Sequence, residues 1–259
     1  MGGITLSHRQ WEIMNLLQSY KSMSVENLAE YFDVTTTTIR RELTQLEKNS
    51  LVTRSRGYAH IAEEPMVSSF DVRCQMSAQE KMLLARHAIK YIQPSDTILL
   101  DAGSTIYTLA KEIAYSDIPG LAVITYSLPI ASVLARSCLT IVTGGTVDSA
   151  TMSLVGPNAE SSLDSVVANK LFLSTTGVNS SMGLTVTSQL SLGMKRKMMS
   201  RATEIIALID STKWSSAGLN IFCKLQELDR IITVRNEKNA ESLKKLEDSG
   251  VHLDCIDME

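Results

Sequence analysis

Hydroxyl and guanidinium groups gather on one face of a helix predicted over residues 35–46. They belong to Thr37, Arg40, Arg41 and Thr44, with Thr36 and Thr38 beside them. Ile39, Leu43 and Leu46 recur at i, i+4 and i+7, so the opposite face of this helix is apolar. Arginine pairs bidentately with guanine and also binds phosphate, so the polar face is suited to a nucleic acid. A helix whose polar face is simply solvated would have the same pattern.

A second group of hydrogen-bonding residues follows the apolar run 97–100. Asp101 comes first, and its carboxylate could accept hydrogen bonds from sugar hydroxyls or cap the helix that follows. Gly103, Ser104 and Thr105 then open that predicted helix, whose free N–H groups and dipole favour a phosphate. A plain turn is the alternative interpretation of these small residues.

Two further segments have residues suited to ligand binding. Gly144 and Gly145 follow the apolar run 139–143, where a backbone without side chains lets a ligand approach closely. Lys195 opens another predicted helix together with two more basic residues and could supply a cation. A solvated basic face would explain the same cluster, and the sequence leaves both interpretations open.

Composition limits the possible classes of protein. The chain has 259 residues, enough for two domains, with 44% apolar and 20% charged residues. No apolar run approaches the ~18 residues of a membrane span, and the N-terminus lacks the apolar core of a signal peptide, so we expect a cytoplasmic protein with no membrane partner. The four cysteines and four histidines are dispersed, so no metal site and no cofactor is expected.

Charge is unevenly distributed along the chain. The formal net charge is −3, but residues 34–60 contain five basic side chains against two glutamates. The basic residues are Arg40, Arg41, Lys48, Arg54 and Arg56. A small basic module on an acidic protein is expected where one part meets phosphates and the rest does not.

The elements around residues 35–46 predict a winged helix-turn-helix. Apolar residues at helical spacing indicate helices from Ser7 to Tyr20 and from Ser24 onward, and Thr35 is a good N-cap for the third helix. The alternating segment 51–61 indicates a hairpin, or wing, with basic residues near its turn. In this motif the polar-faced helix lies in the major groove.

The rest of the chain alternates between short strands and helices. The predicted strands are residues 97–100, 122–125, 139–143, 170–174, 205–209 and 230–234. This alternation predicts an α/β domain with a largely parallel sheet covered on both faces, and ligands bind beyond the carboxyl ends of such strands. We therefore expect a DNA-binding domain over 1–61, a linker over 62–78 and an effector-binding domain over 79–259.

The sequence also resembles a known family over both domains. Residues 34–47, which contain Thr-Ile-Arg-Arg-Glu-Leu, resemble the DNA-binding signature of the DeoR family of bacterial sugar-metabolism regulators, as do Leu51, Arg54 and Gly57 that follow. In the second domain the similar segments are 101–105, 123–129, 144–145, 154–157, 183–185 and 210–213. The chain departs from the family at Ser50, Arg56 and Tyr58, and it lacks acidic residues that the family has near 175–179 and 189–193.

The resemblance implies a sensor domain related in fold to ribose-5-phosphate isomerase and glucosamine-6-phosphate deaminase. By that analogy Gly103, Ser104, Thr105 and Lys195 would hold the phosphate of a phosphorylated sugar, and Asp101 and Gly145 would line the site. It also implies a homo-oligomer, a dimer or a tetramer.

These observations predict a transcriptional regulator, a repressor, that binds operator DNA and a phosphorylated sugar or related metabolite. Arg54 and Arg56 are assigned to DNA phosphates, which position a protein without specifying sequence. One alternative is a sugar-phosphate isomerase or deaminase-like enzyme. Such chemistry needs a base whose pKa lies near neutral pH, and the loops lack the carboxylates that would be expected to serve as this base. Another is a winged helix that contacts only proteins, which the clustered arginines argue against.

Overall fold

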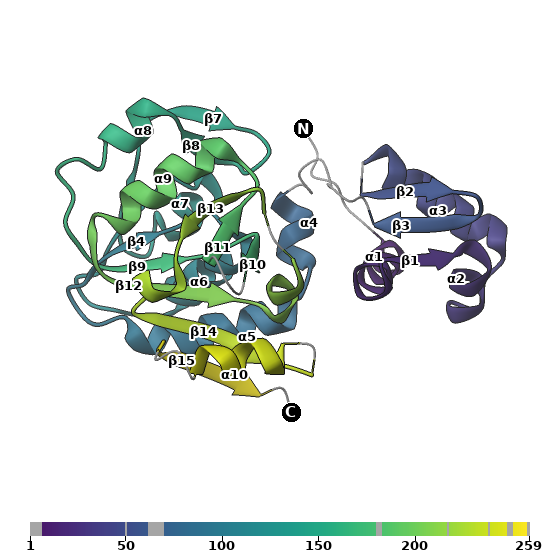
Figure 1. Ribbon diagram of the computed structural model, residues 1–259. Coiled ribbons are helices and arrows are strands. Elements are labelled where there is room, and N and C mark those ends of the chain that lie inside the picture. Colours follow the sequence, from purple (N-terminus) through teal and green to yellow (C-terminus); the bar gives the residue numbers. More distant parts are fainter. Residues whose placement is uncertain are drawn as a thin grey trace. The chain divides into compact units, whose positions relative to one another are not determined.

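The computed structural model describes residues 7–49, 51–61, 70–179, 183–216, 218–237, 239–247 and 251–257 (Figure 1). The chain divides into two compact units, Met1–Met76 and Ser77–Glu259. The division falls inside the predicted linker, of which residues 62–69 lie outside the described residues and α4 (Phe70–Gln75) forms a helix. None of the helices in the described ranges has the length and apolarity that crossing a membrane requires.

The first unit is a winged helix-turn-helix. Its elements are α1 (His8–Tyr20), β1 (Ser22–Ser24), α2 (Val25–Tyr31), α3 (Thr36–Lys48), β2 (Val52–Ser55) and β3 (Tyr58–Ile61). The hydroxyls of Ser7, Ser24 and Thr35 each accept a hydrogen bond from an N–H of the first turn that follows, which confirms the predicted helix starts. Ile39, Leu43 and Leu46 are fully buried, as the apolar stripe of α3 predicts.

The wing is an antiparallel hairpin closed by two residues. Arg56 and Gly57 have φ of 47° and 85°, and two successive positive φ values give the turn whose twist matches that of paired strands. β1 pairs with β3 and extends the hairpin into a sheet with the order β1-β3-β2. β1 was not predicted from the sequence, because a strand of three residues is too short to show an alternating pattern.

In the described part of the second unit, a parallel sheet has seven strands in the order β15-β14-β12-β9-β4-β5-β6. They are β4 (Thr97–Leu100), β5 (Ala122–Thr125), β6 (Leu139–Val142), β9 (Ala168–Leu173), β12 (Ala202–Ile209), β14 (Arg230–Arg235) and β15 (Leu253–Asp257). Every neighbouring pair is parallel, which confirms the predicted α/β sheet; β15 was not predicted.

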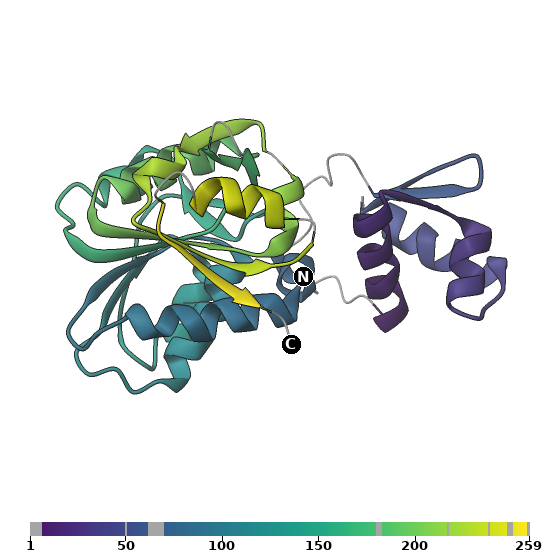
Figure 2. The same ribbon diagram turned by 60° about the horizontal axis from the view of Figure 1, so that its bottom comes forward.

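Helices cover both faces of this sheet (Figure 2). They are α5 (Ala78–Ala88), α6 (Ser104–Tyr115), α7 (Leu128–Leu134), α8 (Pro157–Ser161), α9 (Gln189–Met199) and α10 (Ala240–Glu247), with 3₁₀ turns η1 (Ile89–Tyr91), η2 (Ser211–Ser215) and η3 (Leu225–Glu227). Ile98 and Leu100 of β4 pack in the cluster with α5, α6 and α7, whereas Leu99 packs in the cluster with α8, α9 and α10. Burial on both faces explains why β4 is a continuous apolar run.

Two smaller sheets lie beside the parallel one. They consist of β7 (Thr146–Asp148) with β8 (Ser153–Val155), and of β10 (Gly177–Asn179), β11 (Gly183–Val186) and β13 (Asn220–Cys223). In the main sheet the chain runs from β4 outward to β5 and β6, and from β9 outward in the opposite direction to β12. The loops after β4 and β9 therefore meet where the strand order reverses, the usual place for a ligand in an open α/β sheet.

Candidate functional site

The outer face of α3 presents the groups predicted to meet DNA. Thr37, Arg40 and Arg41 are exposed, whereas Thr36 and Thr38 are half-buried. In the described part of the chain, the guanidinium groups of Arg40 and Arg41 have no ion pair or hydrogen bond. Two arginines whose donors are unengaged can form bidentate hydrogen bonds with bases or phosphates.

A cleft of about 380 Å³ lies between α3 and the start of α1. Thr37, Thr38 and Arg41 line it from α3, and Ser7 and Gln10 line it from the first helix. The Gln10 amide is buried and donates to Oε1 of Gln45 at 2.5 Å, which ties α1 to α3. The sequence predicts only that a helix begins at Ser7, because Ser7 and α3 lie far apart in the chain and no local pattern indicates their proximity.

Arg54 is engaged within the first unit. Its Nε donates to Oε2 of Glu47 at 2.9 Å, and a second guanidinium nitrogen donates to the Thr44 hydroxyl at 3.1 Å. That hydroxyl in turn donates to the carbonyl of Arg40 at 2.7 Å. Arg54 thus ties the wing to α3, while Arg56, at the tip of the wing, is exposed. Contacts of either arginine with phosphate stay a prediction.

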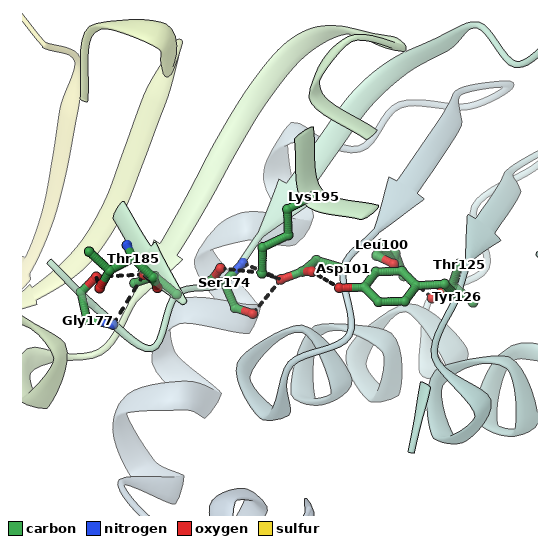
Figure 3. A network of polar contacts seen from close by, with 9 residues as sticks. Leu100, Asp101, Thr125, Tyr126, Ser174, Gly177, Thr185 and Lys195 are labelled. Atoms are coloured by element: carbon green, nitrogen blue, oxygen red, sulfur yellow. Dashed lines mark hydrogen bonds and ion pairs between the residues drawn. The ribbon is translucent and has the colours of Figure 1, made fainter. Parts of the chain in front are cut away.

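Asp101 is the centre of a buried polar network at the end of β4 (Figure 3). Its Oδ1 accepts a hydrogen bond from the Tyr126 hydroxyl at 2.6 Å. Its Oδ2 accepts from the backbone N–H and the hydroxyl of Ser174 at 2.9 and 2.5 Å, and from Nζ of Lys195 at 2.5 Å. The loops after β4, β5 and β9 and the helix α9 therefore converge on one carboxylate.

Charge and burial set the protonation of this network. Burial alone would raise the pKa of Asp101, but the charge of Lys195 and the hydrogen bonds from Lys195, Ser174 and Tyr126 together lower it below its usual value. Burial and the neighbouring carboxylate raise the pKa of Tyr126 well above its usual value. At neutral pH the site therefore holds an aspartate anion at Asp101 and a neutral tyrosine at Tyr126.

The ammonium group of Lys195 contacts three groups of the protein. Besides Asp101 it donates to the Ser174 carbonyl at 2.8 Å, and it lies 4.9 Å from the centre of the Phe222 ring. The helix α9 begins at Gln189, after the N-cap Ser188, so Lys195 lies inside the helix and does not open it as the sequence analysis expected. A phosphate-binding role for Lys195 stays a prediction.

The N-terminus of α6 lies directly after Asp101. Gly103 is its N-cap and has no side chain to occupy the free N–H groups of the first turn. A Cβ at this position would lie 2.0 Å from Oγ of Ser174, so a larger residue would displace a member of the network. Ser104 and Thr105 are buried, and no hydrogen bond from either hydroxyl is found within the described ranges.

Gly144 and Gly145 pack against α8. The N–H of Gly144 donates to the Ser162 hydroxyl at 3.2 Å. Gly145 has φ of 126°, and a Cβ there would lie 2.8 Å from Cβ of Ala159. Close packing of the loop on α8 thus accounts for Gly145, and a ligand contact at either glycine stays a prediction.

A carboxylate that the sequence analysis missed lies beside α9. Glu160 of α8 is half-buried, and its Oε1 lies 2.2 Å from where a Cβ of Gly193 would be. Within the described residues this carboxylate has no hydrogen bond or ion pair. Residues 189–193 have no acidic side chain of their own, but Gly193 leaves room for one supplied by α8. Among the described residues, no cluster of three potential metal ligands is found.

Comparison with known proteins covers both units. A model of the DeoR-like helix-turn-helix domain matches residues 9–64, and one of the DeoR C terminal sensor domain matches residues 76–235. The HTH-type transcriptional regulator YulB of Bacillus subtilis (strain 168) is 34% identical over 97% of both chains. The L-fucose operon activator of Escherichia coli (strain K12) is 30% identical, over 87% of this chain and 93% of the activator.

A putative aga operon transcriptional repressor of Escherichia coli O157:H7 is 28% identical, over 95% of this chain and 93% of the repressor. Among solved structures, ribose 5 phosphate isomerase A from Neisseria gonorrhoeae aligns with 52% of this chain and 52% of its own, with 16% identity and a TM-score of 0.37.

Proposed function

Because this chain belongs to the DeoR family of transcriptional regulators, we propose that it represses an operon of carbohydrate use by binding operator DNA through its first unit. The observation that carries the proposal is the exposed face of α3, where Arg40 and Arg41 have no partner among the described residues. An operon repressor and an operon activator among the relatives support control of transcription. A protein bound at an operator acts in the cytoplasm beside the DNA.

The geometry of the first unit suggests how it binds. With α3 in the major groove, Thr37, Arg40, Arg41 and Thr44 face base edges, and the cleft beside Ser7 receives the adjacent phosphate backbone. Arg54 holds the wing against α3, so that Arg56 can reach a second phosphate. One such module reads few bases, so a homo-oligomer, a dimer or a tetramer, would bind two half-sites.

Fluorescence anisotropy with the promoter region of its own gene tests this proposal. We expect binding that survives an excess of unrelated DNA, and loss of that preference in the double variant Arg40→Ala/Arg41→Ala. Arg136→Ala is the matched control, because Arg136 is an exposed arginine of the second unit without a partner in the described residues. Equal affinity of the wild type and the double variant would refute a DNA-reading role for α3.

We propose a phosphorylated sugar or related metabolite as the effector of the second unit. The N–H groups of the first turn of α6, with Ser104 and Thr105, would hold its phosphate. Asp101 and Lys195 neutralise each other, so we assign them to positioning the loops after β4 and β9. Glu160, which has no partner within the described residues, is a candidate acceptor for hydroxyl or amino groups of the effector.

A thermal-shift screen of sugar phosphates tests the effector proposal, since a ligand that binds only the folded state raises its apparent stability. A stabilising compound should lose its effect in Ser104→Val and keep it in Ser137→Val, a matched change at an exposed serine elsewhere in the unit. A compound that stabilises both variants equally would show that the N-terminus of α6 does not bind the effector.

Binding without turnover fits this site better than isomerisation does. A base that removes a carbon-bound proton needs a pKa near the working pH and an accessible carboxylate. Asp101 is fully buried, its pKa is lowered, and both of its oxygens accept hydrogen bonds from the protein. The sugar-phosphate isomerase alternative therefore has no support from Asp101.

A further inference from the structure

The strand β6 has an unusual environment for the edge of a sheet. It pairs with β5 on one side and with no strand on the other side among the described residues, so a row of its N–H and C=O groups is unpaired. Its apolar side chains are also exposed: Leu139 to 65%, Ile141 to 47% and Val142 to 39%. Exposed apolar edge strands pair readily with another chain.

The sequence has none of the features that normally protect such an edge. From residue 139 to residue 147 there is no charged residue and no proline. The opposite edge of the same sheet differs, because β15 contains Asp254 and Asp257 within five residues. Proteins place charges or prolines on edge strands that face solvent, so β15 is a protected edge and β6 is not.

Apolar surface continues beyond β6. Ile141 pairs with Ile124 and Val142 with Thr125, so the exposed side chains of β6 lie on both faces of the sheet. Val147 of β7 and Met152, which precedes β8, are exposed to 54% and 40%. Together these five apolar side chains expose an area on the order of 400 Å², without the backbone and flanking residues. This is about half of the ~800 Å² that each partner buries in a standard interface.

We propose that β6 is the contact between two copies of this chain, paired antiparallel across a two-fold axis so that the two parallel sheets join into one. A two-fold contact brings the same surface against itself, which requires that like charges do not meet, and the uncharged stretch 139–147 meets that requirement.

This inference goes beyond the proposed function, because it concerns a surface of the second unit and can be tested without DNA. It would supply the two DNA-binding units that an operator with two half-sites needs. If the Arg40 and Arg41 variants kept their DNA affinity, the proposed DNA contacts would be wrong, but the proposed dimer would be unaffected. If the protein were a monomer, the proposed dimer would be wrong, but the first unit could still bind a single half-site weakly.

Sedimentation velocity of the full-length wild type and of variants with a charged residue at position 141 tests the contact. We expect a dimer or a tetramer for the wild type, and half that mass for Ile141→Lys and for Ile141→Glu when each is measured alone. The control Val167→Lys should keep the wild-type mass, because Val167 is 82% exposed and lies outside the uncharged stretch.

Mixing the two Ile141 variants separates loss of contact from loss of folding. Position 141 of one copy lies close to position 141 of the other in the proposed pairing, so lysine and glutamate attract and the mixture should regain the wild-type mass. A monomeric wild type, variants that keep the wild-type mass, or a mixture that stays at half mass would each overturn the proposal.

Discussion

Because Lys195 and Asp101 form a buried ion pair, substitutions of either residue should change the free energy of unfolding. Replacing Lys195 by methionine leaves the Asp101 charge buried without its cation, which typically costs about 3–5 kcal/mol in free energy of unfolding. The double variant Asp101→Asn/Lys195→Met should recover part of that loss, since both charges are gone. Urea unfolding at pH 7 measures all three proteins. A single variant that loses less than about 1 kcal/mol would mean that the ion pair is not buried as described.

The lowered pKa of Asp101 predicts how stability depends on pH. A carboxylate whose pKa is lower in the folded than in the unfolded state stabilises the fold above the unfolded value of about 4, and this contribution is lost as the pH falls below it. The difference in stability between the wild type and Asp101→Asn should therefore shrink between pH 5 and pH 3. Unfolding by urea at both pH values measures it. A difference that grows at pH 3 would contradict the lowered pKa.

The wing depends on a contact that its own sequence does not reveal. If Arg54 positions the wing through Glu47, then Glu47→Ala and Arg54→Ala should weaken operator binding to a similar extent, because each breaks the same link. Neither should change the salt dependence of binding. If Arg54 instead contacts a phosphate, Arg54→Ala alone should reduce the salt slope by about 1. Anisotropy titrations at several salt concentrations distinguish the two outcomes.

Gly103, the N-cap of α6, and Gly193, inside α9, should respond to alanine in opposite ways. Gly193→Ala should be neutral or stabilising by up to about 1 kcal/mol, because alanine favours the helix and only the mobile end of Glu160 must move. Gly103→Ala should destabilise, since its Cβ would also lie 2.8 Å from Cβ of Ser174, close to the backbone. Thermal unfolding of both variants measures the difference. Equal effects would contradict the packing described here.

The elements were predictable where local signals are strong. The apolar stripe of α3 and the caps Ser7, Ser24 and Thr35 depend on residues three to seven positions apart, so the sequence alone located these helices. The three-residue strands of β1 and β7 are too short for any period. The start of α9 was placed too late in the sequence. The approach of the Glu160 carboxylate to Gly193 could not be predicted, because no local pattern reports a contact between different elements.

At the scale of the whole molecule, strand order explains why the site was only partly foreseen. The strand ends carrying Asp101 and Ser174 could be recognised as candidates, but their adjacency depends on β4 lying next to β9 in the sheet. Lys195 was expected as a free cation, and the structure instead shows it paired with Asp101, 94 residues away in the chain.

Control of DNA binding by an effector requires that the effector binds two arrangements of the molecule with different affinity.

Selection of binding sites from a random pool of double-stranded DNA tests the central claim most directly. The full chain should enrich one sequence made of two related half-sites, whose centres lie about 10 base pairs or a multiple of that apart. The Arg40→Ala/Arg41→Ala protein, carried through the same selection, should enrich none. A wild-type protein that enriches no sequence, or a double variant that enriches the same sequence equally well, would contradict the assignment of α3 as the element that reads DNA.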